Sequence, residues 1–122
     1  MSPFVIVGTG GLGRELLGWI TGCGAETRAR FRVAGFISEA GDAGTVIHGV
    51  PVFHPDNWAG ERPRFVMAFA DPTKKKRLAL ELEARGWQPE TFIHDSAVVG
   101  LASTIGPGTV VCPFCSISTD CT

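Results

Sequence analysis

The chain has 122 residues, which suits one compact domain and leaves little room for a second. Hydrophobic residues make up 44% and charged residues 19%, so the composition supports a buried core. The formal net charge of −1 gives no bulk attraction to nucleic acid or to an anionic membrane, and no apolar run approaches the ~20 residues of a membrane helix. The start "MSPFVIVG" lacks the basic residues and cleavage site of a signal peptide. We therefore expect a soluble, cytoplasmic protein.

The first three quarters of the chain predict strands that alternate with helices. Short runs rich in β-branched or aromatic residues predict strands at 4–7, 31–38, 64–71 and 90–94. A helix is predicted after the first strand, ended by Gly22 and Gly24, and a second one at 72–86, with Pro72 in its first turn and Gly86 as its cap. The stretch 46–53 predicts a short strand or hairpin-like excursion, and Pro51 argues against a central strand there. This alternation predicts an α/β fold: a small Rossmann-like parallel sheet with flanking helices.

A six-residue repeat begins at about residue 93. One register carries β-branched aliphatic residues and the other carries small residues: Ile93, Val99, Ile105, Val111 and Ile117, and Ala97, Ser103, Thr109, Cys115 and Cys121. An inward aliphatic residue and a small residue near a corner describe one flat face of a triangular β-helix. Three such hexapeptides close a coil. The expected division is therefore 1–92 for the Rossmann-like domain and 93–122 for the beginning of a β-helix.

The stretch Gly8-Thr9-Gly10-Gly11-Leu12-Gly13 is a G-x-G-x-x-G between a strand and a helix. Glycines let the backbone turn sharply and approach a phosphate, and the helix N-terminus supplies free N–H groups. We favour nucleotide or diphosphate binding over a tight turn without a ligand.

Two acidic residues lie where strand ends are predicted to face that loop. Glu39, beside Ser38, either bonds a ribose hydroxyl or base edge or is an exposed turn residue. Asp71, after Ala70, either lies near the ligand or caps the next helix. Lys75 is the preferred phosphate contact in a basic run that is otherwise a solvated face. His48, His54 and His94 show no metal-ligand spacing, so no metal is expected, and Trp19, Trp58 and Trp87 are most simply core or interface residues.

Several stretches together resemble one family, the sugar O-/N-acyltransferases, which includes sialic-acid O-acetyltransferases and bacillosamine N-acetyltransferases of bacterial glycan synthesis. These stretches are "FVIVGTGGLGRELLGWI", "VAGFIS", "FVMAFADPTKKKRL" and "FIHDSAVVGLASTIGPGTVV". The resemblance implies a Rossmann-like domain that binds a nucleotide-linked sugar, usually a UDP-sugar. It also implies a left-handed β-helix that forms a homotrimer and binds acetyl-CoA between subunits, with a β-helix histidine as general base.

By position, the resemblance implies substrate contacts from the loop residues and from the two strand ends: Gly8, Thr9, Gly10, Gly11, Leu12, Gly13, Ser38, Glu39, Ala70, Asp71 and Lys75. Leu12 stands where the family usually has His, and Ser38 stands where an acidic residue is common. No histidine matches the catalytic one, which is expected beyond Thr122. We therefore expect an N-terminal part of a longer enzyme that is not catalytically competent alone.

Two other functions stay open. A stand-alone NAD(P)-binding oxidoreductase or regulator would use the same glycine loop and the C-x-x-C of Cys112 and Cys115, and an assembly module would only scaffold a trimer. The hexapeptide register explains the C-x-x-C as packing, because Cys115 falls on a small-residue position and no second C-x-x-C completes a zinc site. In the cytoplasm Cys23 and the other cysteines are expected to be thiols.

Overall fold

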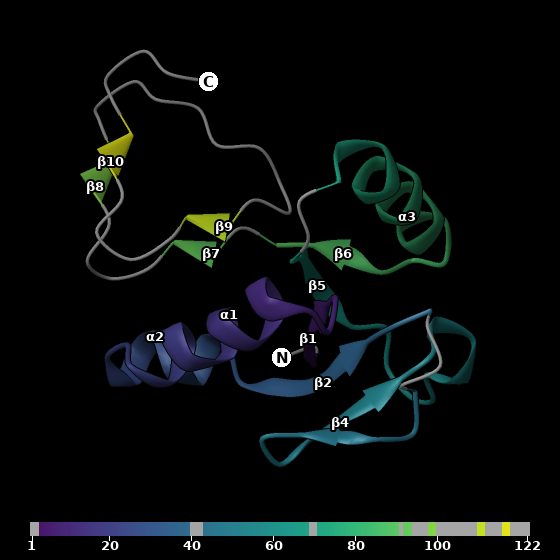
Figure 1. Cartoon of the computed structure of the whole chain (residues 1–122), viewed down its shortest axis with the longest axis horizontal. Coiled ribbons are helices and arrows are strands. Elements are labelled where there is room, and N and C mark those ends of the chain that lie inside the picture. The colour runs from purple at the N-terminus through teal and green to yellow at the C-terminus, as the bar shows by residue number, and fades with distance from the viewer. Residues whose placement is uncertain are drawn as a thin grey trace.

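The computed structural model describes residues 3–39, 43–68, 71–90, 92–93, 98–99, 110–111 and 116–117. Its body is a six-stranded sheet of order β3-β4-β2-β1-β5-β6 (Figure 1). The strands are β1 (Phe4–Val7), β2 (Val33–Ile37), β3 (Val46–Ile47), β4 (Val50–Phe53), β5 (Arg64–Met67) and β6 (Gln88–Pro89). The helices are α1 (Gly11–Thr21), α2 (Ala25–Arg30) and α3 (Pro72–Ala84), with a 3-10 turn η1 (Pro55–Asn57). Within the described ranges, no helix is long and apolar enough to cross a membrane.

Both faces of the sheet are covered, because alternate residues of its strands point to opposite sides. Phe4 and Ile6 of β1 pack with Leu16 and Ile20 of α1 on one face. The neighbouring residues of the same strand, Val5 and Val7, pack on the other face, in a cluster that includes residues of β5 and α3: Phe65, Met67, Leu78 and Leu82. The near-continuous apolar strands are therefore those of a parallel sheet between helical layers, as the sequence predicted.

The predicted strands at 4–7, 31–38 and 64–71 and both predicted helices are present, each within a few residues of its expected bounds. Helix α2 and strand β6 were not predicted from the sequence. The six residues of α2 bury no side chain, so they carry no apolar periodicity that would predict a helix. The two residues of β6 pair with the start of β5 and have no strand-like composition.

The excursion at 46–53 is a hairpin, but one expectation about it is wrong. His48 and Gly49 have φ of 48° and 81°, as the central residues of a type I′ turn require. Pro51 lies in β4, which is an inner strand between β3 and β2. The proline is tolerated because Val52 donates the hydrogen bond to the Thr45 carbonyl, at 2.9 Å, and the ladder with β2 begins only at Val52.

Four short strands follow the sheet in the second part of the chain, and they pair at one fixed separation. Strand β7 (Phe92–Ile93) is parallel to β9 (Val110–Val111), and β8 (Val98–Val99) is parallel to β10 (Ser116–Ile117) (Figure 1). Phe92 pairs with Val110 and Val98 pairs with Ser116, so both pairs join residues 18 positions apart. Eighteen residues are three hexapeptides, the length predicted for one coil.

Phe92 connects this part of the chain to the sheet. Its side chain is fully buried, and its ring lies edge-on to Phe31 at 5.2 Å between centroids. Phe31 in turn packs edge-on against Phe4 of β1 at 5.1 Å. The remaining repeat positions, namely Ala97, Ser103, Ile105, Thr109, Cys115 and Cys121, lie outside the described residues, as do His94 and Cys112. The packing explanation of the C-x-x-C therefore stays a prediction.

Candidate functional site

A cleft of about 580 Å³ opens at the carboxyl ends of β1, β2 and β5. Strand β1 has β2 on one side and β5 on the other, so the strand order reverses there. Ligands of open parallel sheets bind outside the strand ends at such a reversal. The strands are held together up to this edge, since Gly8 N–H donates to the Ile37 carbonyl at 2.9 Å and Ala68 N–H donates to the Val7 carbonyl at 2.8 Å.

The glycines of the loop between β1 and α1 have different roles. Gly8 has φ of 119°, which side chains rarely allow. A Cβ on Gly13 would lie 2.2 Å from the Gly8 carbonyl oxygen, so this glycine permits close packing of helix and strand. A Cβ on Gly10 or Gly11 would meet nothing within 4 Å. Gly8 and Gly13 are therefore required by the fold, whereas Gly10 and Gly11 leave a bare backbone surface in the cleft.

Among the described residues, the N-cap position of α1 offers no side-chain acceptor to the first N–H groups of the helix. Gly10 is the N-cap residue and offers no side-chain acceptor, and the first turn holds no acidic residue. Arg14 lies next to it and donates through Nε to the Thr9 carbonyl at 3.1 Å. Unsatisfied N–H groups and the positive end of the helix dipole favour an anion at this position.

Asp71 has the capping role that the sequence left open, and it also lines the cleft. Its Oδ1 accepts hydrogen bonds from the backbone N–H groups of Thr73, at 3.0 Å, and Lys74, at 3.2 Å. The cap fixes where α3 begins and therefore which of its residues face the cleft.

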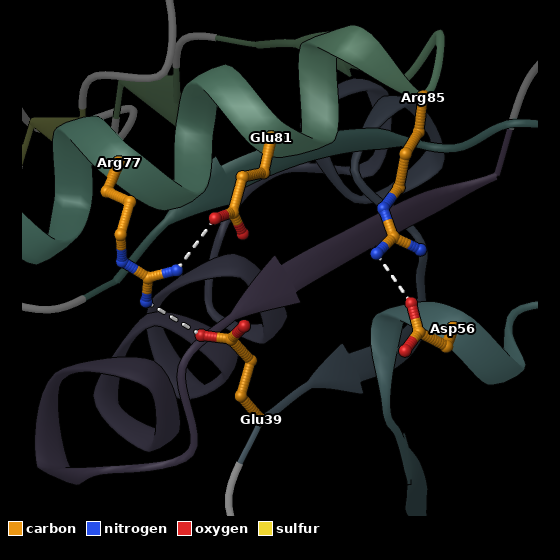
Figure 2. Close-up of polar contacts among 5 residues, drawn as sticks. All are labelled: Glu39, Asp56, Arg77, Glu81 and Arg85. Atoms are coloured by element: carbon orange, nitrogen blue, oxygen red, sulfur yellow. Dashed lines mark hydrogen bonds and ion pairs between the residues drawn. The ribbon is translucent and has the colours of Figure 1, made fainter.

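Glu39, at the end of β2, is joined to α3 by an arginine (Figure 2). Arg77 donates through Nη2 to Glu39 Oε1 at 3.0 Å and through Nη1 to Glu81 Oε1 at 2.9 Å. The hydrogen bonds to Glu39 and then to Glu81 raise the pKa of Arg77 above its ordinary value. Glu39 is thus not merely an exposed turn residue. Sequence reasoning missed Arg77, although its spacing of four from Glu81 is that of a helical ion pair.

Most of the predicted site residues meet in this cleft. Its wall includes Gly8, Thr9, Gly10, Gly11, Leu12, Ser38, Glu39 and Asp71. Gly13 lies buried beneath the loop, and Ala70 is outside the described residues. Lys75 is not among the lining residues, whereas Lys74 is. Lys74 shares a helix face with Asp71 and Leu78, which both line the cleft, and Lys75 is turned about 100° away, since a helix has about 3.6 residues per turn. Ligand binding by these residues stays a prediction.

The histidines and tryptophans that the structure describes lie in structural positions. His54 accepts the Asp56 N–H through Nδ1 at 3.1 Å, and His48 lies in the hairpin turn. Trp87 is buried in the core, and Trp58 packs against it with its ring 6.2 Å away. Searched over the described ranges alone, the chain brings no three His, Cys, Asp or Glu residues close enough to hold a metal ion.

Comparison with solved structures gives matches over nearly the whole chain. A His-to-Asn mutant of perosamine N-acetyltransferase from Caulobacter crescentus, in complex with CoA and GDP-perosamine, aligns with a TM-score of 0.78 and 23% identity over 98% of this chain. The acetyltransferase domain of PglB from Neisseria gonorrhoeae, in complex with acetyl coenzyme A, aligns with a TM-score of 0.75 and 16% identity, again over 98%. This chain has the fold of these acetyltransferases.

The matched structures are longer than this chain, which covers 56% of the perosamine N-acetyltransferase and 65% of the PglB domain. Both are acetyltransferases, in agreement with the family that the sequence resembles. No protein-family model and no curated protein matches the sequence. At these identities the likeness shows the fold.

Proposed function

We propose that this chain holds the nucleotide-sugar-binding part of an acetyl-CoA-dependent sugar O- or N-acyltransferase. One arrangement carries the proposal: a bare glycine loop forms a cleft at the strand reversal, and strands paired 18 residues apart follow it. The perosamine N-acetyltransferase with the same fold was crystallised with CoA and GDP-perosamine, and the PglB domain with acetyl coenzyme A.

In this proposal residues 1–92 form the nucleotide-sugar-binding domain and residues 93–122 begin a left-handed β-helix. The two 18-residue pairings support the β-helix, since adjacent coils of three hexapeptides stack at that interval. The family resemblance implies a homotrimer with acetyl-CoA between subunits, and we expect the protein to be cytoplasmic. The histidine that deprotonates the sugar amine or hydroxyl would be supplied by the β-helix of the whole enzyme.

The cleft would contact both the diphosphate and the nucleoside of the nucleotide. The diphosphate would accept hydrogen bonds from the first N–H groups of α1, over the bare surface of Gly10 and Gly11. Lys74, in the wall on the α3 side, would add positive charge near it. Glu39, at the end of β2, would accept a hydrogen bond from the nucleoside. Leu12 and Ser38 would form an uncharged part of the cleft wall.

Two observations point to different nucleotide bases, uracil and guanine. The sequence resemblance implies a UDP-sugar, whereas the perosamine N-acetyltransferase of the same fold was crystallised with GDP-perosamine. The test therefore includes both nucleotides.

Isothermal titration calorimetry of the chain with GDP, UDP and one sugar conjugate of each tests the proposal, with NAD⁺ as the alternative ligand. Gly11→Glu is the informative variant, because nothing lies within 4 Å of a Cβ there and the added carboxylate would face the diphosphate. Like charges a few ångströms apart at a protein surface repel by several kcal/mol, so affinity should fall at least about tenfold.

Gly18→Glu is the matched control, since Gly18 lies on the same helix, is exposed and also has free space around it. It should leave the affinity unchanged. Equal losses in both variants, or binding of NAD⁺ with no binding of any nucleotide sugar, would count against the proposal.

A further inference from the structure

Arg77 bridges two carboxylates, one that follows a strand of the sheet and one on its own helix. Glu39 follows β2, while Arg77 and Glu81 lie one turn apart on α3, and each carboxylate receives a different nitrogen of the guanidinium group (Figure 2). Glu39 is the most protected of the three, with its side chain 33% exposed against 49% for Arg77 and 47% for Glu81. Glu81 therefore holds Arg77 from within the helix, and Arg77 reaches across to Glu39.

Glu39 and Arg77 line two different hollows of the surface. Glu39 lines the cleft, whereas Arg77 lines a shallow surface depression with Thr73, Lys76 and Leu80. Arg77 donates its hydrogen bond to Oε1 of Glu39, and no hydrogen bond to Oε2 is seen among the described residues. The arginine thus supports the carboxylate from outside and leaves one oxygen for the cleft.

We propose that Arg77 is a positioning residue that holds Glu39 so that Oε2 accepts a hydrogen bond from the nucleoside, either from a ribose hydroxyl or from a base N–H. The inference rests on the proposed nucleotide binding. A glutamate side chain is flexible, and fixing it before the ligand arrives removes part of the entropy lost on binding. The carboxylate only accepts hydrogen bonds, so its partner must be a donor group of the ligand.

Calorimetry with GDP and with UDP on the wild type, Arg77→Gln, Glu39→Gln and the double variant tests this role. Arg77→Gln should weaken nucleotide binding about two- to fivefold, the range that an exposed ion pair supplies. The loss should disappear in the Glu39→Gln background, and the affinity for inorganic pyrophosphate should stay unchanged, because the diphosphate contacts lie elsewhere. Repeating the titration with the 2′,3′-dideoxy nucleotide separates the two donors: the Arg77 effect vanishes for a ribose donor and persists for a base donor.

Arg85→Gln is the matched control. Arg85 makes an ion pair with Asp56 at the other end of α3, so the variant removes the same charge and one ion pair from the same helix, away from the cleft (Figure 2). Equal affinity loss in both variants would show a general effect on α3 and overturn the proposal. Unchanged or tighter nucleotide binding by Arg77→Gln would also overturn it, the latter by showing that Arg77 competes with the ligand for Glu39. A wild-type chain that binds neither nucleotide would refute the proposed function itself, and the inference with it.

Discussion

Gly13→Ala tests whether the glycine loop is as tightly built as the structure shows. The added Cβ would lie 2.2 Å from the Gly8 carbonyl oxygen and 3.1 Å from the Gly8 carbonyl carbon, both backbone atoms that a side-chain rotation cannot relieve. Overpacking of this kind destabilises a protein by about 1–3 kcal/mol. For a domain of this size, 1 kcal/mol shifts the unfolding temperature by about 4–8 °C, so the clash alone should lower Tm by at least about 4 °C relative to a variant that gains the same helix propensity without the clash.

Thermal unfolding followed by circular dichroism measures the change, with Gly18→Ala as the control on the same helix. A Cβ on Gly18 meets nothing within 4 Å, and alanine is favoured over glycine in a helix interior by about 1 kcal/mol, so Tm should rise. The two variants share the helix-propensity gain and differ in the clash. A Tm for Gly13→Ala equal to or above that of Gly18→Ala would refute the close approach of α1 to Gly8.

Two further predictions concern the ends of α3. Asp71→Ala removes the acceptor for the N–H groups of Thr73 and Lys74. Loss of such a cap costs about 0.5–2 kcal/mol, so Tm should fall, whereas Asp71→Asn should keep most of the wild-type stability. Equal stability of both variants and the wild type would exclude the cap. At the other end, the hydrogen bond from Arg85, together with its charge, lowers the pKa of Asp56 in the folded protein. The pair therefore stabilises the fold at pH values above the ordinary aspartate pKa of about 4. This stabilisation is lost as the pH falls through the lowered pKa of Asp56 in the folded state. Thermal unfolding at a series of acidic pH values should therefore show a shallower loss of stability for Arg85→Gln than for the wild type, and identical slopes would show that the pair does not form in solution.

The strands and helices that define the fold could be predicted because each carries a local signal. β1, β2 and β5 are short apolar runs, and α3 has a proline at its start and a glycine after its end. The hexapeptide register predicted coils of 18 residues, and β7 pairs with β9 and β8 with β10 at that separation, while the β-helix itself stays a prediction. By contrast α2, which buries no side chain, gave no periodic signal.

The site could be predicted only in part, because some of its contacts depend on the tertiary arrangement. The glycine loop and the strand-end positions of Glu39 and Asp71 followed from the order of strand, loop and helix. The partner of Glu39 did not, since Arg77 is 38 residues away and meets it only when α3 packs on the sheet. The choice of Lys74 over Lys75 depends on the helix phase that Asp71 and Pro72 set, and the run of four basic residues in the sequence does not reveal that phase.

The most direct test of the account is a map of the nucleotide-sugar site by amide chemical-shift changes in ¹⁵N-labelled protein. Titration with GDP- and UDP-sugars should shift the amides of Gly8 to Gly13 together with those of Ser38, Glu39 and Asp71, the residues that the cleft brings together. Gly18 and Arg85, away from the cleft, should not move. Shifts confined to another surface, or no shifts with any nucleotide sugar, would contradict the central claim that this cleft binds a nucleotide-linked sugar.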